Sequence, residues 1–118
     1  MIGKWQALVI DCEDPDKLAS FYQELLGMIR VQENDEFISI GDAADRPAVA
    51  LQRVERLVRP QWPDAEHPQQ MHMDVLVEDL DAAETEVLRL GATSLNAGSK
   101  TFRVYTDPSG HPFCLVLT

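Results

Sequence analysis

Residues 7–27 read ALVIDCEDPDKLASFYQELLG and residues 72–91 read HMDVLVEDLDAAETEVLRLG, so the chain contains one pattern twice. Each copy begins with an apolar-rich segment, continues through Glu-Asp, and ends an amphipathic run with Leu-Gly. The two Glu-Asp pairs lie 65 positions apart in a chain of 118 residues. One repeat therefore fills about half of the chain, and the fold is predicted to consist of two similar modules.

The amphipathic run of each copy is predicted to be a helix with an aspartate cap. Asp14 precedes Pro15, and proline suits the first helical position because its missing N–H would have no partner there. Gly27 can adopt the left-handed conformation that ends a helix, and Asp79 and Gly91 take the equivalent places in the second copy. The expected buried stripes are Leu18, Phe21, Tyr22, Leu25 and Leu26 in the first helix and Leu80, Ala83, Val87, Leu88 and Leu90 in the second.

Three strand-like segments follow each helix. They are residues 28–32, 36–40 and 48–54 in the first copy and residues 92–96, 101–106 and 112–117 in the second. Polar residues over 41–47 predict a break between strands, and Asp107-Pro-Ser-Gly110 is typical of a tight turn. Each half is therefore predicted to be a βαβββ module.

The stretch between the halves is predicted to be a connector. Residues 58–70 contain three prolines and no apolar period, and we expect this segment to pack through Trp62. The predicted organisation is one α+β domain over residues 1–118. Module one covers about 1–57, the connector about 58–70 and module two about 71–118.

Charge and composition exclude several classes of partner. The net charge is −10, which repels phosphate backbones and anionic lipid, so we expect neither nucleic acid nor a membrane as partner. No segment approaches the roughly 20 apolar residues that span a bilayer, and no signal peptide is visible. The two cysteines, Cys12 and Cys114, are expected to be free thiols in the cytoplasm.

The ordered set of motifs resembles the glyoxalase / bleomycin-resistance / extradiol dioxygenase superfamily, also called the vicinal oxygen chelate proteins. The resemblance rests on the strand–Asp–helix ending Phe21-Tyr-Gln-Glu-Leu-Leu-Gly27, on a second module that opens with His72, and on Asp107-Pro-Ser-Gly110. The connector Pro60-Gln-Trp-Pro63 is similar to the glyoxalase-like branch. The resemblance implies curved mixed sheets around a cleft with helices packed outside, and it implies a homodimer.

The resemblance also implies where a divalent metal would bind. Enzymes of the superfamily take up to four ligands from the first and last strands of the two modules. The matching positions here are Ala7, Gln52, His72 and Cys114. Ala7 has no donor atom and Gln52 is a weak ligand, so this set falls short of the three firm ligands that a catalytic zinc site needs. We therefore expect no metal and no cofactor.

Strand alternation predicts which side chains line the cleft. Besides Asp74, the expected lining residues are Trp5, Ala7, Val9, Asp11, Gln52, His72 and Cys114. This mixture of apolar and polar groups suits a small-molecule site. Cys12 is assigned to the opposite, helix-facing side, so a Cys12–Cys114 disulfide is not expected.

Each polar candidate has a structural alternative. His72 and Asp74 lie on one face of a strand and can form an acid–base pair, or Asp74 can bind nearby backbone while His72 is an inherited remnant. Cys114 is a nucleophile if acidified and otherwise a packed thiol, and no Lys or Arg is predicted beside it. Trp5 and Trp62 can stack on a planar ligand or anchor the terminus and the connector.

Two histidines lie outside the predicted site. His111 follows the tight turn and is expected to be a surface turn residue. His67 lies in the connector and is expected to be exposed to solvent.

Three functions fit these features. The first is a metal-free protein that binds a small, mainly apolar or aromatic molecule in the cleft. The second is a lyase, isomerase or dioxygenase that uses His72 with a partial metal or acid–base site. The third is an interaction module without a ligand. The incomplete ligand set favours the first, while metal-dependent glyoxalase activity is not expected.

Overall fold

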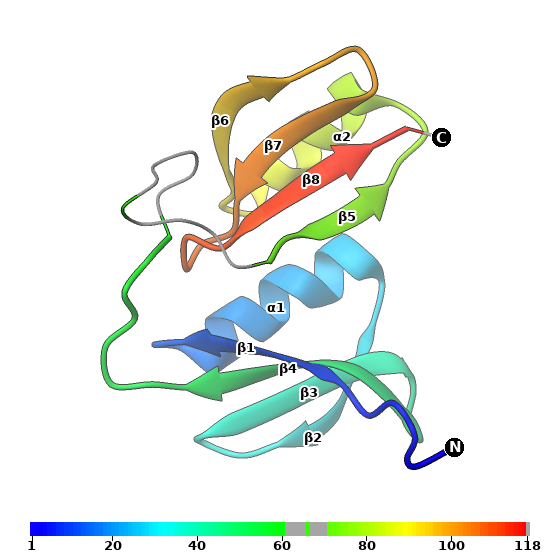
Figure 1. Ribbon diagram of the computed structural model, residues 1–118, viewed down its shortest axis with the longest axis vertical. Helices are drawn as coiled ribbons and strands as arrows, with labels where there is room; N and C mark the ends of the chain where they lie inside the picture. The colour runs from blue at the N-terminus through cyan, green and yellow to red at the C-terminus, as the bar shows by residue number, and fades with distance from the viewer. Residues whose placement is uncertain (61–65, 67–70, 118) are drawn as a thin grey trace. The chain divides into compact units, whose positions relative to one another are not determined.

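The computed structural model describes residues 1–60, 66 and 71–117. These residues form two compact units, 1–57 and 58–118. The described residues of each unit form one helix and one four-stranded mixed sheet in the chain order βαβββ (Figure 1). The predicted fold class is thereby confirmed. The predicted packing of Trp62 and exposure of His67 lie outside the described residues.

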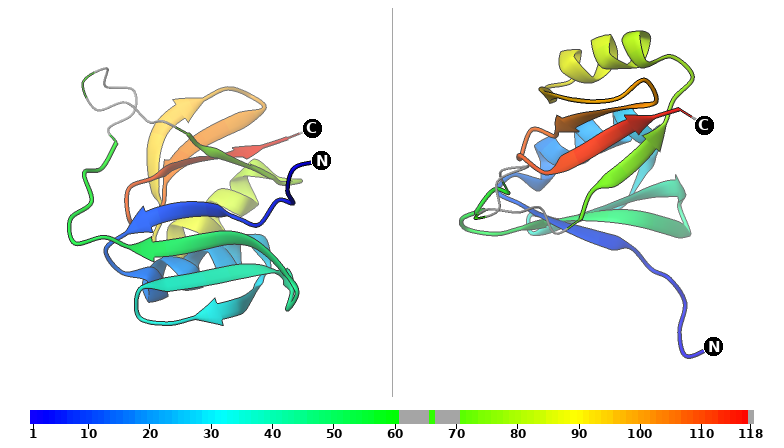
Figure 2. Two further views of the ribbon diagram at one scale, coloured as in Figure 1. Left: turned by 60° about the horizontal axis from the view of Figure 1, so that its bottom comes forward. Right: turned by 45° about the horizontal axis from the view of Figure 1, so that its top comes forward.

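The first unit has the strand order β1-β4-β3-β2. β1 (Leu8–Cys12) pairs in parallel with β4 (Arg46–Arg53). On its other side β4 pairs antiparallel with β3 (Phe37–Ala43), and β3 pairs antiparallel with the edge strand β2 (Ile29–Glu33). Helix α1 (Pro15–Leu26) packs on one face of this sheet, chiefly against β3 and β4 (Figure 2, left).

The second unit repeats this topology with the order β5-β8-β7-β6. β5 (Met73–Leu76) pairs in parallel with β8 (Pro112–Val116), and β7 (Phe102–Thr106) pairs antiparallel with β8 on one side and with β6 (Thr93–Gly98) on the other. Helix α2 (Leu80–Arg89) runs along one face of the sheet (Figure 2, right). Among the residues described for this unit, no helix lies on the opposite face.

Both helix N-termini and the C-terminus of α1 follow from the predicted caps, whereas the C-cap of α2 is Leu90, one residue before the predicted Gly91. The Asp14 carboxylate accepts a hydrogen bond from the Lys17 amide at 3.1 Å, and Asp79 accepts one from the Ala82 amide at 3.1 Å. Gly27 ends α1 with φ 67°, in the left-handed region that glycine adopts without strain. The predicted burial of Leu88 is wrong. This side chain is 43% exposed, because it lies one residue beyond the buried Val87 and so points away from the sheet.

The strand boundaries show one further correction. The break predicted over residues 41–47 is much shorter, since β3 continues to Ala43 and β4 begins at Arg46. Gly41 makes this continuation possible, because its backbone lies against the Arg46 carbonyl oxygen where a side chain would not fit. The Asp107–Gly110 turn is present as predicted, with the Gly110 amide donating to the Asp107 carbonyl at 2.9 Å.

Candidate functional site

The pairing register of β5 and β8 brings the polar candidates of the second unit together. Asp74 is the register partner of Cys114, and Cys114 is also paired with Val104 on β7. Partners in register present their side chains on the same face of a sheet. His72 precedes Asp74 by two residues and therefore shares that face. This face lies opposite α2, and the face of each sheet that is opposite its own helix is called its open face below.

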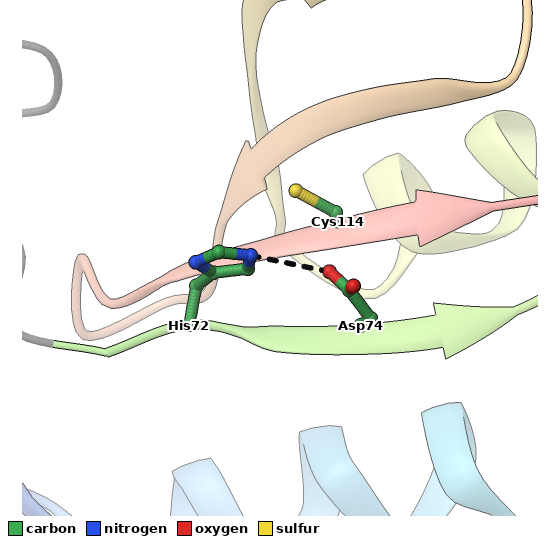
Figure 3. Close-up of side chains that lie close together, drawn as sticks. All are labelled: His72, Asp74 and Cys114. Atoms are coloured by element: carbon green, nitrogen blue, oxygen red, sulfur yellow. Dashed lines mark ion pairs between the residues drawn. The ribbon is translucent and has the colours of Figure 1, made fainter.

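The three polar side chains form a compact cluster. The Nε2 atom of His72 lies 3.2 Å from the Oδ1 atom of Asp74 (Figure 3). One donor atom from each of His72, Asp74 and Cys114 lies within 4.8 Å of the others. The His72 and Asp74 side chains are 41% and 60% exposed, whereas Cys114 is 8% exposed. The cluster thus has one buried member on an inner strand and two exposed members at the sheet edge.

The cluster lies at the side of a hollow of about 470 Å³ on the same face of the sheet. This volume falls in the range of about 300–1,000 Å³ that is usual for small-molecule sites. The remaining lining residues are Thr101, Phe102, Val104, Pro112, Val116 and Leu117. The hollow therefore combines an apolar wall with one polar corner.

The protonation of Cys114 follows from its surroundings. Burial raises the pKa of the Cys114 thiol, and the neighbouring Asp74 carboxylate raises it further. A raised pKa keeps the sulfur protonated at neutral pH, which opposes a role as an activated nucleophile. The surroundings therefore favour the packed-thiol interpretation in the metal-free chain.

The predicted lining residues of the first module lie on the open face of the other sheet. Asp11 and Gln52 are register partners on β1 and β4, both are exposed, and Val9 is 43% exposed on the same face. Ala7 and Trp5 precede β1, and Trp5 is 75% exposed, so it does not anchor the terminus within this unit. A cleft shared by the two modules remains a prediction.

The other cysteine and the turn histidine take no part in the cluster. Cys12 is fully buried, and its thiol donates to the Gln52 carbonyl oxygen at 3.6 Å. Neither Cys12 nor Cys114 forms a disulfide. His111 is half-buried, and its amide donates to the Asp107 carboxylate at 3.0 Å.

The residues do not fit the four-ligand metal site that the superfamily implies. Among the four matching positions, Ala7 has only a methyl group and Gln52 offers only a neutral amide oxygen, so two of the four are a blank and a weak ligand. Asp74, which the four-position pattern omits, is the third donor beside His72 and Cys114. The second module therefore has a donor set that differs from the superfamily pattern.

Strand alternation places Pro112 and Val116 on the same face as Cys114, and both line the hollow, but sequence reasoning missed the part of the apolar wall that β7 supplies. Phe102 and Val104 belong to it because β7 lies beside β8, with Val104 paired to Cys114 and Phe102 paired to Val116. Alternation along residues 101–106 was available as a signal. Choosing the correct face also required the register between β7 and β8, which the alternation of one strand does not provide.

The comparisons with known proteins agree with this topology. Residues 7–116 match the family described as Glyoxalase-like domain, so the chain belongs to the glyoxalase-like family of the vicinal oxygen chelate superfamily. No curated protein matches the chain. The family defines the class of protein and leaves the ligand open.

Solved structures share the fold at low sequence identity. A glyoxalase/bleomycin resistance protein/dioxygenase family enzyme from Burkholderia phytofirmans PsJN is 14% identical with a TM-score of 0.72, and the match covers 95% of this chain and 96% of that one. Fosfomycin resistance protein FosX from Mesorhizobium loti is 13% identical with a TM-score of 0.70, covering 100% and 93%. A hypothetical protein from S. aureus, SA1046, is 20% identical with a TM-score of 0.67, covering 100% and 99%.

Proposed function

We propose that this glyoxalase-like chain binds a small organic molecule in the hollow on the open face of the β5-β8-β7-β6 sheet. The observation that carries the proposal is the pairing of an apolar wall, formed by Phe102, Val104 and Val116 among others, with the polar corner at His72, Asp74 and Cys114. Such sites bind the apolar body of a ligand by burial and orient it through a few polar contacts.

The charge of the hollow favours a neutral or cationic ligand. Asp74 is a carboxylate, and no lysine or arginine is among the lining residues of the described chain. The net charge of −10 acts in the same direction. A molecule with an aromatic ring and an amine meets both requirements, with the ring against the apolar wall and the ammonium near Asp74.

The same charge argues against an anion as the ligand of the metal-free chain. Two of the structural relatives are named fosfomycin resistance proteins. Fosfomycin carries an anionic phosphonate group, and only a protonated His72 would offer it a positive side chain among the lining residues described. We therefore do not extend that ligand to this chain.

Thermal-shift measurements with matched probes test the proposal. Aromatic amines and carboxylic acids on the same rings are compared in the presence of EDTA. We expect the amines to raise the melting temperature and the acids to leave it unchanged. A ligand at 100 times its dissociation constant stabilises the folded state by about 2.7 kcal/mol.

Two variants locate the binding. Val116→Trp fills the hollow and should abolish the shift, whereas Leu88→Trp adds the same group to the exposed surface of α2 and should preserve it. Equal shifts in both variants would place the ligand elsewhere and contradict the proposal.

A second candidate function is catalysis by the His72–Asp74 pair. The 3.2 Å contact between Nε2 and Oδ1 is the geometry in which a carboxylate orients an imidazole for proton transfer. A lyase or isomerase would then act on a molecule held in the same hollow. Asp74→Asn separates the candidates when turnover of a bound compound is assayed, because it should reduce the rate far more than it weakens binding of a neutral ligand.

A further inference from the structure

We infer that the second module alone holds a soft divalent cation, Zn²⁺ or a metal of similar ligand preference, between the side chains of His72, Asp74 and Cys114. This inference goes beyond the proposed binding of an organic molecule. It rests on the positions of three donor atoms, whereas the proposed function rests on the apolar wall of the hollow. It also departs from the four-position pattern of the superfamily, since no donor comes from the first module.

The topology places Asp74 and Cys114 on two adjacent strands and His72 directly before the first of them. Asp74 and Cys114 are register partners across the parallel β5–β8 pair, and His72 stands two residues before Asp74 on the same face. Figure 3 shows the three side chains extending from these strands on one side of the sheet. The buried Cys114 sulfur is fixed on an inner strand, and the two edge donors lie in front of it.

The chemistry of the donors selects the cation. Imidazole nitrogen, carboxylate oxygen and thiolate sulfur are the three ligand types found in zinc sites, and three protein ligands with one open position are usual in catalytic zinc sites. Binding of the cation displaces the proton of the Cys114 thiol to solvent, so the sulfur coordinates as a thiolate. A thiolate disfavours Mg²⁺, Ca²⁺ and Mn²⁺, which prefer oxygen ligands. A hard cation is therefore not expected to compete.

The distances fit a site that closes on binding. Zinc bonds of about 2.0 Å to nitrogen or oxygen and about 2.3 Å to sulfur place the donors of a tetrahedral site roughly 3.3–3.6 Å apart. The His72–Asp74 contact of 3.2 Å already meets this spacing, and the cluster as a whole spans 4.8 Å. The remaining approach, about 1 Å, requires rotation only of the exposed His72 and Asp74 side chains.

Titration with Co²⁺ tests the inference without an activity assay. The untagged full chain is stripped with EDTA, exchanged into buffer without chelator and titrated with Co²⁺, and a thiolate-to-cobalt charge-transfer band is followed in the near ultraviolet. We expect the band to saturate at one equivalent of Co²⁺ and to disappear when one equivalent of Zn²⁺ is added.

Variants assign the ligands. Cys114→Ala should abolish the band, whereas Cys12→Ser, which alters the other buried thiol, should retain it. Asp74→Asn and His72→Ala should each weaken Co²⁺ binding at least tenfold, and Glu78→Gln, an exposed acidic residue just beyond β5, should leave it unchanged. Because Asp74 is exposed, Asp74→Asn is expected to fold, and circular dichroism of each stripped variant verifies this.

Three outcomes would overturn the inference. They are a band that survives Cys114→Ala, binding that Asp74→Asn leaves unchanged, and loss of the band in Gln52→Ala, which would assign the cation to donors from both modules. Failure here is separate from failure of the proposed function, because the organic probes are measured with EDTA present and the Co²⁺ titration contains no organic ligand.

Discussion

Tyr105 shows how a buried polar group links the sheet of the second module to its helix. The side chain is fully buried on the α2 side of β7, and its hydroxyl donates to Oε1 of Glu84 at 2.9 Å. Burial raises the pKa of Tyr105 to about 12, and the hydrogen bond to Glu84 acts in the same direction. The folded state therefore holds the phenolic proton more tightly than the unfolded state, whose tyrosine titrates near 10.

This pKa difference predicts the alkaline stability of the chain. The contribution of Tyr105 is fully present below about pH 10 and is lost as the pH rises from about 10 to 12. Tyr105→Phe should lower the free energy of unfolding at pH 7 by about 1 kcal/mol, because the hydrogen bond to Glu84 is removed. It should also flatten the decline above pH 10. Urea unfolding at several pH values measures both effects, and an unchanged alkaline decline in the variant would contradict the assignment.

Gly41 provides a second test at the level of single residues. A Cβ atom at this position would overlap the Arg46 backbone carbonyl, which cannot move without opening the β3–β4 pair. Gly41→Ala should therefore destabilise the chain by more than about 2 kcal/mol, whereas Gly3→Ala, which meets open space, should stay within about 0.5 kcal/mol. Similar unfolding free energies for the two variants would show that the hairpin relaxes around the added methyl group.

Individual site residues were predictable from sequence to different degrees. His72, Asp74 and Cys114 could be assigned to one face because alternation needs only their spacing and a strand assignment. Asp74 as a third donor beside Cys114 was not predicted, because that contact depends on the parallel β5–β8 register. Phe102 and Val104 were missed for the same reason, since strand register is a property of two segments and not of one.

The secondary-structure elements follow from local chemistry, and the helix caps illustrate this. Asp14 and Asp79 each accept a hydrogen bond from the backbone amide three residues later. Caps of this kind could be predicted because the aspartates lie just before the amphipathic runs. The end of β3 could not be predicted in this way, because the polar residues Asp42 and Asp45 suggest a loop. Only the fit of Gly41 against β4 shows that the strand pairing continues.

The caps predict matched losses of stability. Asp14→Ala and Asp79→Ala should each cost about 1 kcal/mol, since each removes the acceptor for one otherwise unpaired amide at a helix N-terminus. Hydrogen exchange followed by mass spectrometry should show faster exchange confined to residues 15–20 in the first variant and 80–85 in the second. Replacing the exposed Asp42 with Ala provides the control, and a loss of equal size there would show that net charge, not capping, is responsible.

Arg103 connects strand β7 to helix α2. Its guanidinium donates to Asp81 at 2.7 Å and to Glu84 at 3.3 Å, and both acceptors lie on α2. Glu84 also accepts from Tyr105, so one carboxylate on α2 binds two residues of β7. This network lies on the face opposite the hollow, and substitutions within it are expected to affect stability and not ligand binding.

At the scale of the whole molecule, the repeat specifies the fold but not the chemistry. Both units share a capped helix, a parallel first-to-last strand pair and two antiparallel pairs. The side chains on their open faces differ. In the first sheet the parallel strand pair places Asp11 beside Gln52, whereas in the second sheet it places Asp74 beside Cys114. The described helices include none long and apolar enough to cross a membrane.

The resemblance to the superfamily predicts a homodimer. The chain has a mass of 13.3 kDa, and sedimentation velocity over a range of concentrations distinguishes that mass from its double. We expect the dimer to predominate at micromolar concentrations. A single species with the mass of one chain at every concentration would show that this member of the family remains a monomer.

Binding of ligands to the open face of the second module can be mapped residue by residue with an amide chemical-shift titration. The isotope-labelled chain is titrated with Zn²⁺ and, separately with EDTA present, with an aromatic amine. We expect the largest shifts at residues 72–76, 102–104 and 112–116 for both probes. Shifts centred on Asp11 and Gln52, with the second module unchanged, would contradict this expectation.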